Sequence, residues 1–324
     1  MMNAKHALTR CLRPVCWSLA FLTAGSFTAS AQSQRTHEQL IRADRLSETQ
    51  AIEYLYAMRT SSFAESYVFR FQIKHYPYRA RSFSYHGTLY GQIDPLTGEQ
   101  RERIVIQQRD PEQPRQSLTL RDLLLVRGPQ PHAWVAQPEQ IPAQHSAQNE
   151  DPTSLPTSQT DTDSPSTSLP KMTQLDAPVL EGISLTPFDL LVPYFYWNRF
   201  EYRGPEQVKA RPTQSFRLHS PNSDFPIQTV EVELDDEFRA VLKATYLGAD
   251  GNPLKSMELI AFKKTGDTYI PKTLDYRESG DRGDKTRIDI IAASMEVDLP
   301  SELFEPDNVG QELPSIDPFI YDVF

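Results

Sequence analysis

The residue types that most often carry chemistry are thinly spread along this chain of 324 residues. Of its histidines, six follow residue 31, and no two of them stand two or four residues apart, as neighbouring metal ligands usually do. The sequence has no H-E-x-x-H motif, no G-x-S-x-G motif and no phosphate-binding glycine loop. The six histidines after residue 31 are His37, His75, His86, His132, His145 and His219. We therefore expect isolated histidines, no metal site and no cofactor.

Two acidic clusters could suggest metal binding or acid–base catalysis, but both stand where a turn is expected. Asp235-Asp236-Glu237 separates two stretches of alternating apolar and polar residues, and acidic residues commonly begin turns. Asp250-Gly251-Asn252 has the composition of a hairpin turn. The tripeptide within Asp281-Arg282-Gly283-Asp284 is interpreted as chance. No catalytic residue is predicted, and the chain is not expected to be an enzyme.

Alternation of apolar and polar residues at period 2 dominates residues 213–291. In residues 229–235, valine and leucine alternate with acidic residues. Comparable stretches follow at 239–247, 256–264, 269–278 and 285–291, with short turns between them. Closely spaced strands of this kind form an antiparallel meander with one buried face. That face must be covered by another sheet, by helices or by a ligand.

A first β block is predicted between residues 67 and 135. Phe69 and Phe71 point to one side of their strand because they alternate with polar residues. Tyr85 and Leu89 repeat the pattern in the next strand. The first block therefore adds a second apolar face to that of the meander, where Val230 and Val232 belong.

A helix is predicted in front of each β block. Ser47 and Gln50 form a capping box for a helix over residues 48–60, with Leu55 and Tyr56 on its apolar stripe.

The second predicted helix begins strongly and is interrupted early. Thr186 is a suitable N-cap, Pro187 a suitable first residue, and Asp189 lies in the first turn. Pro193 breaks or kinks the helix. Its apolar residues are Phe188, Leu191, Tyr194, Phe195 and Trp197. A segment that is apolar nearly all round is expected to be buried.

Residues 1–31 have the pattern of a secretory signal peptide. A basic start is followed by a short apolar core at residues 15–27 and by Ala29-Ser30-Ala31, which predicts cleavage before Gln32. A membrane anchor is the alternative, but the apolar core is short for a bilayer span. The chain after residue 31 is expected in the periplasm or outside the cell.

Both cysteines, Cys11 and Cys16, lie in that segment, so the cleaved chain has no disulfide and no thiol. Removing residues 1–31 takes away three basic residues and no acidic one, which changes the net charge from −10 to −13. An acidic chain repels nucleic acid and anionic membrane surfaces, so neither is expected as a partner.

Residues 137–177 differ from the rest of the chain. They hold no aromatic residue and are rich in serine, threonine, proline, glutamine and aspartate. Such a segment cannot bury enough apolar surface to offset the entropy of ordering, so a disordered insertion is predicted. An interaction segment or glycosylated stalk is the alternative. Residues 32–324 are expected to form one domain that this insertion interrupts.

Several stretches of the sequence resemble the LolA-like family of outer-membrane lipoprotein-sorting proteins. The likeness is best over residues 187–306 and weaker over 47–135, and the chain is longer than the usual member. The stretches that carry it are 187–197, 217–220, 230–235, 244–255, 269–272, 285–288 and 299–306. They are loose patterns, so no ligand contact of the family is carried over to a particular residue.

The resemblance implies a mainly β protein, a half-open antiparallel barrel of about 10–12 strands wrapped around helices. It also implies a monomeric, non-enzymatic periplasmic carrier of lipoprotein acyl chains or other lipid. An inner-membrane release complex and an outer-membrane acceptor would be its partners. The apolar ligand would contact Phe69, Phe71, Tyr85, Leu89, Leu191, Phe195, Trp197, Val230 and Val232. The alternative is an envelope scaffold with a filled core that acts through its surface or the insertion.

Overall fold

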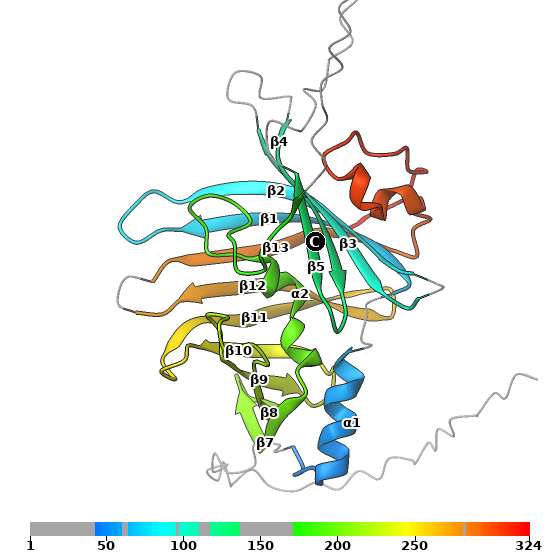
Figure 1. Ribbon diagram of the computed structural model, residues 1–324. Helices are drawn as coiled ribbons and strands as arrows, with labels where there is room; N and C mark the ends of the chain where they lie inside the picture. Colours follow the sequence, from blue (N-terminus) through cyan, green and yellow to red (C-terminus); the bar gives the residue numbers. More distant parts are fainter. Residues whose placement is uncertain (1–42, 60–63, 95–96, 110–116, 137–170, 281–282) are drawn as a thin grey trace, which may run out of the picture. The chain divides into compact units, whose positions relative to one another are not determined.

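The computed structural model describes residues 43–59, 64–94, 97–109, 117–136, 171–280 and 283–324, all within one compact unit that spans residues 41–324 (Figure 1). The predicted signal peptide and residues 137–170 of the predicted insertion lie outside these ranges. None of the helices in the described ranges has the length and apolar content that a bilayer span requires.

The described residues form a single antiparallel sheet of 14 strands. Its order is β6-β5-β4-β3-β2-β1-β13-β12-β11-β10-β9-β8-β7, and the short β14 also pairs with β13. The strands are β1 (Ser66–Tyr76), β2 (Phe83–Ile93), β3 (Gln100–Arg109), β4 (Ser117–Arg127), β5 (His132–Ala136), β6 (Lys171–Met172), β7 (Arg199–Val208), β8 (Arg211–His219), β9 (Thr229–Asp235), β10 (Val241–Leu247), β11 (Pro253–Thr265), β12 (Thr268–Glu278), β13 (Lys285–Met295) and β14 (Asp322–Val323).

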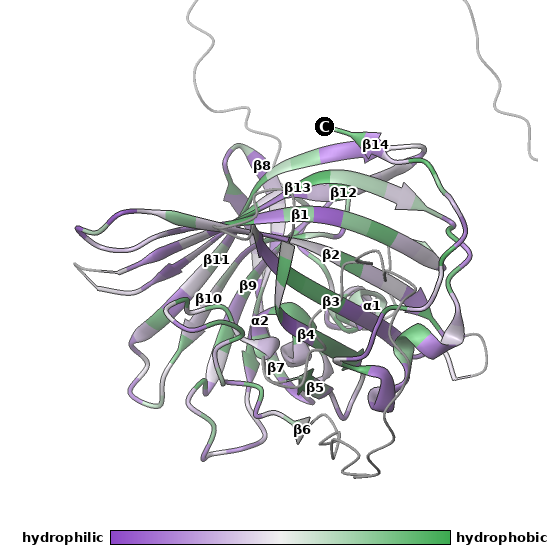
Figure 2. Cartoon of the chain, turned by 90° about the horizontal axis from the view of Figure 1, so that it is seen from above, coloured by the Kyte–Doolittle hydropathy of each residue, from purple (hydrophilic) through white to green (hydrophobic). Residues whose placement is uncertain are grey.

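This architecture confirms the predicted fold class. The sheet is open, since β6 and β7 lie at its two ends and no pairing joins them. Seen from above in Figure 2, the strands curve around the helices α1 and α2. Apart from β6 and β14, which have two residues each, twelve strands remain, as the sequence led us to expect.

The two β blocks of the sequence meet at β1 and β13. These strands pair from Tyr67 with Met295 to Tyr76 with Lys285, with one irregularity after Arg70. Because the paired residues of β1 and β13 are 209 to 228 positions apart in the chain, only this long-range pairing makes one sheet of the two meanders.

Helix α1 (Glu48–Arg59) begins at the predicted capping box. The backbone N–H of Ser47 donates to Gln50 Oε1 at 2.9 Å, and the N–H of Gln50 donates to Ser47 Oγ at 3.3 Å. Leu55 is buried as predicted, but Tyr56 is 52% exposed and its predicted burial was wrong. Ala51 and Leu55 face the core, so Tyr56 lies on the opposite side of the helix. There the guanidinium group of Arg59 lies over the Tyr56 ring.

The second predicted helix is α2 (Pro187–Leu191), followed by the 3₁₀ helix η2 (Pro193–Tyr196). The break falls at Val192, whose φ of 45° is left-handed, directly before Pro193. The prediction of a break at this proline is confirmed. The side chains of Phe188, Tyr194 and Trp197 pack against one another and are buried.

The sheet has apolar cores on both faces. The face that carries Phe69 and Phe71, here called the inner face, packs against α1, α2 and η2 in the larger core. The opposite face, here called the outer face, carries Val68 and Leu124 and is covered by residues of the C-terminal segment such as Leu303 and Phe304. Two short 3₁₀ helices, η3 (Ser301–Phe304) and η4 (Pro306–Asn308), lie in that segment.

The end of the predicted insertion lies earlier than expected. Residues 171–177 belong to the folded part, because Trp134 of β5 pairs with Met172 of β6 and the N–H of Thr173 donates to the carbonyl of Ala133 at 2.9 Å. Backbone pairing with β5 orders this polar stretch, which composition alone does not indicate.

Candidate functional site

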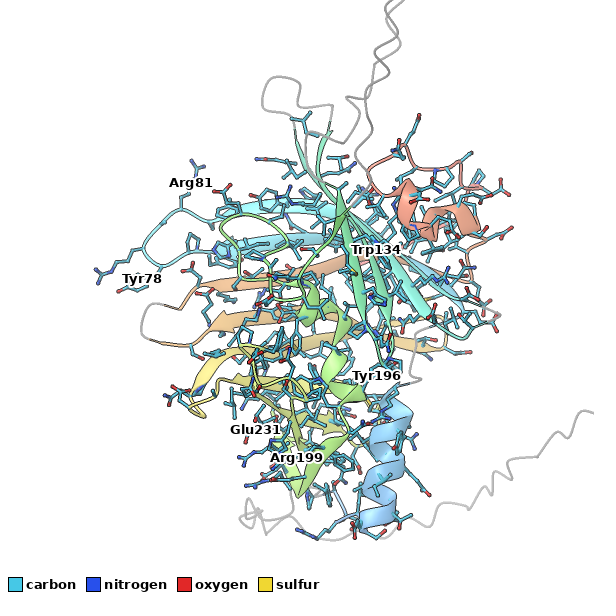
Figure 3. The ribbon with its side chains drawn as sticks, in the orientation of Figure 1. Tyr78, Arg81, Trp134, Tyr196, Arg199 and Glu231 are labelled. Atoms are coloured by element: carbon cyan, nitrogen blue, oxygen red, sulfur yellow. The ribbon has the colours of Figure 1, made fainter. Side chains whose placement is uncertain are left out.

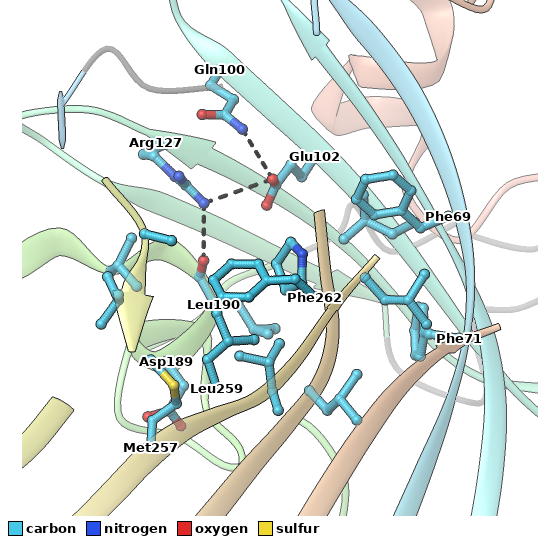
Figure 4. A pocket seen from close by; sticks show the side chains of 18 of the residues that line it. Phe69, Phe71, Gln100, Glu102, Arg127, Asp189, Leu190, Met257, Leu259 and Phe262 are labelled. Atoms are coloured by element: carbon cyan, nitrogen blue, oxygen red, sulfur yellow. Dashed lines mark hydrogen bonds and ion pairs between the residues drawn. The ribbon is translucent and has the colours of Figure 1, made fainter. Parts of the chain in front are cut away.

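A cavity of about 580 Å³ lies between the inner face of the sheet and the elements that cover it (Figure 4). Its sheet wall comes from β1, β2, β3, β4, β10, β11, β12 and β13. Its cover comes from the end of α1, from α2 and η2, and from the turns β9–β10 and β11–β12. The apolar wall includes Phe69, Phe71, Leu89, Ile104, Ile106, Leu259 and Ile290. This volume falls in the range of pockets that hold small molecules.

Two glycines of β2 leave room for two aromatic rings of β1, and one of these rings, that of Phe71, lines the cavity. A Cβ atom at Gly87 would lie 2.3 Å from the ring of Phe71, and one at Gly91 would lie 2.2 Å from the ring of Tyr67. Both rings therefore lie across the neighbouring strand where no side chain stands in their way. The alternation of β1 directs these rings inward, and the glycines of β2 leave free the space that the rings occupy.

Three aromatic side chains stand at the rim of the cavity. Phe238 lies in the β9–β10 turn, with its ring centroid 5.6 Å from that of Phe262 and 4.7 Å from that of Tyr269. Tyr269 is 46% exposed, so this side of the cavity is in contact with solvent. Arg211 lies over the ring of Phe238, with Cζ 4.8 Å from its centroid. The rim is therefore apolar with a cation beside it.

The 3₁₀ helix η2 is fastened to the end of α1 beside the cavity. The hydroxyl of Tyr196 donates to the carbonyl of Arg59 at 2.9 Å, and Arg59 Nε donates to the carbonyl of Phe195 at 2.7 Å. Figure 3 shows Tyr196 where η2 meets α1. These two hydrogen bonds join the covering elements into one layer.

A polar group of residues interrupts the apolar wall. Glu102 is 6% exposed, and its Oε1 accepts hydrogen bonds from the Tyr67 hydroxyl at 2.6 Å and from Gln100 Nε2 at 3.2 Å. Arg127 Nη2 lies 3.7 Å from the same oxygen and donates to the carbonyl of Leu190 at 3.3 Å (Figure 4). Burial, and then the charge of Glu102, raise the pKa of Tyr67, so this tyrosine stays a neutral donor.

A second buried charge lies at the first turn of α2. The carboxylate of Asp189 is fully buried, and its Oδ2 accepts hydrogen bonds from Lys255 Nζ and from the N–H of Thr186, the latter at 2.7 Å. Lys255 Nζ also donates to the carbonyl of Ser184 at 2.7 Å. The other oxygen, Oδ1, has no hydrogen-bond partner among the described residues. Asp189 lines the cavity.

Four of the nine residues predicted to contact a ligand line this cavity: Phe69, Phe71, Leu89 and Phe195. Leu191, Trp197, Val230 and Val232 are buried in the packed core of the inner face, and Tyr85 packs against that core partly buried. A residue on the inner face of the sheet therefore does not always line the cavity. Val230 and Val232 of β9, for example, are covered directly by packed side chains.

The sequence interpretation missed the polar group. Gln100 and Glu102 occupy the same alternating positions of β3 as Ile104 and Ile106, which face the cavity. Arg127 likewise follows Leu123 and Leu125 at period 2 on β4. Polar residues that continue an apolar face of a strand were the available signal, and their partners could not be named without the fold.

No group of three or more histidine, cysteine, aspartate or glutamate side chains is placed to hold a metal ion in the part of the chain that the structure describes. What the cavity offers chemically is apolar surface with a hydrogen-bonding end.

Comparison of the chain with known proteins gives likeness in structure and none in sequence: no family model and no curated protein matches it. A protein of the DUF1329 family from Desulfovibrio piger has a TM-score of 0.60 and 12% identity, covering 79% of this chain and 96% of its own. A domain from Vibrio parahaemolyticus, provisionally named an outer membrane lipoprotein-sorting protein domain, has a TM-score of 0.61 and 12% identity, covering 81% and 97%.

A LolA superfamily protein from Nitrosomonas europaea has a TM-score of 0.53 and 12% identity, and the match covers 80% of this chain and 98% of that one. At such identities the likeness concerns the fold. The resemblance predicted from the sequence is confirmed at this level: the chain has the fold of LolA superfamily proteins.

Proposed function

We propose that this protein is a non-enzymatic carrier that binds an apolar or acylated molecule in the cavity of its inner face. The observation that carries the proposal is the cavity itself, about 580 Å³ with a largely apolar wall. A scaffold with a filled core would have side chains in this space. The bound molecule would contact Phe69, Phe71, Leu89 and Phe195, the four predicted residues that line the cavity.

Burial of an acyl chain is sufficient to drive such binding. If about ten methylene groups left water, the gain would be about 8 kcal/mol, at about 0.8 kcal/mol for each. Part of that gain is lost to the cost of association. No covalent chemistry is needed for capture or release.

The proposed location is the periplasm, with the lipid-modified end of a lipoprotein as the cargo class. Support comes from the signal-peptide pattern of residues 1–31 and from the fold likeness to a domain named for outer membrane lipoprotein sorting. A membrane donor of cargo and an outer-membrane acceptor are the corresponding partners, and the protein would act as a monomer.

The direct test is uptake of N-phenyl-1-naphthylamine, whose fluorescence rises in apolar surroundings, by purified protein stripped of lipid. We expect saturable binding and displacement by long-chain amphiphiles. Native mass spectrometry of protein isolated from its own cell envelope should show a co-purified lipid or acylated partner. Absence of probe uptake by folded protein would contradict the proposal and favour the scaffold alternative.

A further inference from the structure

The hairpin of β1 and β2 carries charges of one sign only. Residues 66–93 contain four arginine or lysine residues and no aspartate or glutamate, in a chain whose net charge is −10. Two of the four, Arg79 and Arg81, lie at the end of the hairpin and are exposed. Figure 3 shows Tyr78 and Arg81 at this end, with side chains that point away from the sheet. The hairpin is therefore a local positive site on an acidic protein.

Three aromatic side chains share the end of the hairpin, residues 76–83, here called the tip. Tyr76, Tyr78 and Phe83 are 40%, 42% and 37% exposed, so each leaves much of its ring in water. Arg79 Cζ lies 5.0 Å from the centroid of the Tyr78 ring. Exposed aromatic rings beside cations are typical of protein segments at a bilayer interface, where the rings lie at the level of the lipid head groups and the cations meet anionic lipid.

Backbone hydrogen bonds hold the tip in a defined turn. The N–H of Ala80 donates to the carbonyl of Pro77 at 3.4 Å, and Arg79 between them has a left-handed φ of 55°. The N–H of Tyr78 donates to Asp284 Oδ1 at 2.7 Å, which ties the turn to the residue before β13. The tip is thus already ordered when it meets a partner, and little conformational entropy remains to be lost.

The arginines of the tip keep their positive charge free for a partner. No ion pair joins Arg79 or Arg81 to a carboxylate within the described ranges. Asp284 brings a carboxylate close, but Lys285 follows it and places Nζ 5.2 Å from the centroid of the Tyr76 ring. At about 0.1 M salt the tip attracts an anionic surface within about 10 Å, one Debye length. Charges of the protein that stay farther from that surface are largely screened.

We propose that the tip of the β1–β2 hairpin docks this protein on bilayer surfaces that contain anionic phospholipid. The three aromatic rings enter the interfacial layer, and the two arginines bind lipid phosphates. An acidic protein segment would suit the charge as well. However, the eight residues of the tip are few beside the roughly 20–30 that each side of a standard protein interface uses. A bilayer accepts a protruding tip without a matching surface.

The net charge of the chain predicts repulsion from such membranes, and the tip is the local exception. Repulsion of the acidic remainder turns the tip toward the bilayer, so the docked protein has one preferred orientation. This inference is independent of the proposed carrier function, because the tip does not line the cavity.

The test is cosedimentation of the purified protein with sucrose-loaded vesicles. One set contains phosphatidylcholine alone, and the other contains equal parts of phosphatidylcholine and phosphatidylglycerol. At about 0.1 M salt the anionic vesicles should bind the protein about 30-fold more tightly, at about 1 kcal/mol for each of the two arginines. At about 1 M salt the Debye length falls to about 3 Å, and the preference should disappear.

Variants of the tip separate its two contributions. Arg79→Gln with Arg81→Gln should lose the preference for anionic vesicles and bind phosphatidylcholine as the unchanged protein does. Tyr78→Ser should weaken binding to both compositions, because its ring enters either bilayer. The matched control is Lys209→Gln with Lys264→Gln, which removes the same charge from side chains outside the hairpin that are 47% and 52% exposed. The control should keep the full preference.

Equal binding to the two compositions, no binding to either, or the same loss in the lysine control would overturn the inference. Retention on immobilised polyglutamate through Arg79 and Arg81, without vesicle binding, would also overturn it and assign the tip to an acidic protein partner. Circular dichroism and a cooperative urea transition should verify that each variant is folded. Uptake of N-phenyl-1-naphthylamine should be the same in all of them, so failure of docking and failure of the carrier function are seen separately.

Discussion

The guanidinium group of Arg103 and the carboxylate of Asp122 form a fully buried two-point pair on the outer face of the sheet. Nε donates to Oδ1 at 3.0 Å and Nη2 donates to Oδ2 at 2.7 Å. Nη2 also donates to the carbonyl of Asn308 at 2.7 Å, and the N–H of Gly310 donates to Asp122 Oδ2 at 2.7 Å. One ion pair thus fastens the C-terminal segment to β3 and β4.

Arg103→Met should destabilise the protein strongly, because Asp122 would remain buried without a counter-charge. Removing one partner of a buried pair costs about 3–5 kcal/mol. The free energy of unfolding from urea titration measures the effect. Arg217→Met is the matched control, since Arg217 and its partner Glu231 are about one-third exposed. The control should lose at most about 1 kcal/mol, and an equal loss in both variants would contradict the role assigned to Arg103.

Leu89→Trp should block the cavity. The larger ring extends from β2 into the space that the ligand would occupy, and probe affinity should fall at least about 10-fold, or 1.4 kcal/mol. Tyr85→Trp is the control, because Tyr85 lies on the same face of β2 but does not line the cavity. Fluorescence titration of both variants measures the difference. Unchanged probe binding in Leu89→Trp would place the apolar site elsewhere.

Val232→Ala should reduce stability without reducing probe binding. Val232 is fully buried in the packed core of β9 and does not line the cavity. Loss of its methyl groups should cost about 2–3 kcal/mol, transfer and cavity contributions together. Urea unfolding and probe titration on the same samples separate the two properties. A large loss of probe affinity would show that the ligand site extends to β9.

Two acidic residues should give opposite pH dependences of stability. Burial acts to raise the pKa of Asp275, but hydrogen bonds from Arg287 and Lys285 outweigh it and hold the pKa below its ordinary value of 3.8. The stability that Asp275 contributes is thus present above about pH 4 and is lost as the pH falls through its lowered pKa. The advantage of the unchanged protein over Asp275→Asn in urea midpoint should shrink on acidification from pH 5 to pH 3, a range that begins above the ordinary pKa of 3.8 and ends below it.

Glu233 is the matched opposite case. Burial first, and the nearby charge of Glu231, raise its pKa above 4.5, and its Oε2 has no partner among the described residues. Its stabilising contribution is present at low pH and is lost as the pH rises through the raised pKa. Glu233→Gln should therefore gain stability relative to the unchanged protein as the pH rises toward neutral. A parallel pH response of the two variants would contradict these assignments.

Replacement of residues 137–170 by a short glycine-containing turn should leave probe binding unchanged. The strands on either side, β5 and β6, already pair with each other, with Val135 opposite Lys171, so a hairpin turn can join them. Probe titration of the shortened protein checks the carrier function. If the protein acts as a scaffold through this segment, the shortened form should keep its fold and lose co-purifying partners instead.

The amino-acid sequence by itself determined the strand content, the faces and the ends of the helices. Alternation at period 2 directs Phe69 and Phe71 inward whatever lies opposite them. The capping residues Ser47 and Gln50 and the proline at 193 act within a few residues of themselves, so their effects were predictable. Local rules of this kind also predicted the turns at 235–237 and 250–252, which the structure contains.

Only the tertiary structure decided where the inner face is filled and where it leaves a cavity. Period 2 gives the direction of a side chain but not the distance to the next layer, so Val232 and Phe69 could not be distinguished in sequence. That distance depends on how α1, α2 and η2 pack over a sheet whose two halves are joined by β1 and β13, which are far apart in the chain. The same long-range packing brings Arg127 of β4 to Glu102 of β3 and to α2, and so creates the polar end of an otherwise apolar cavity.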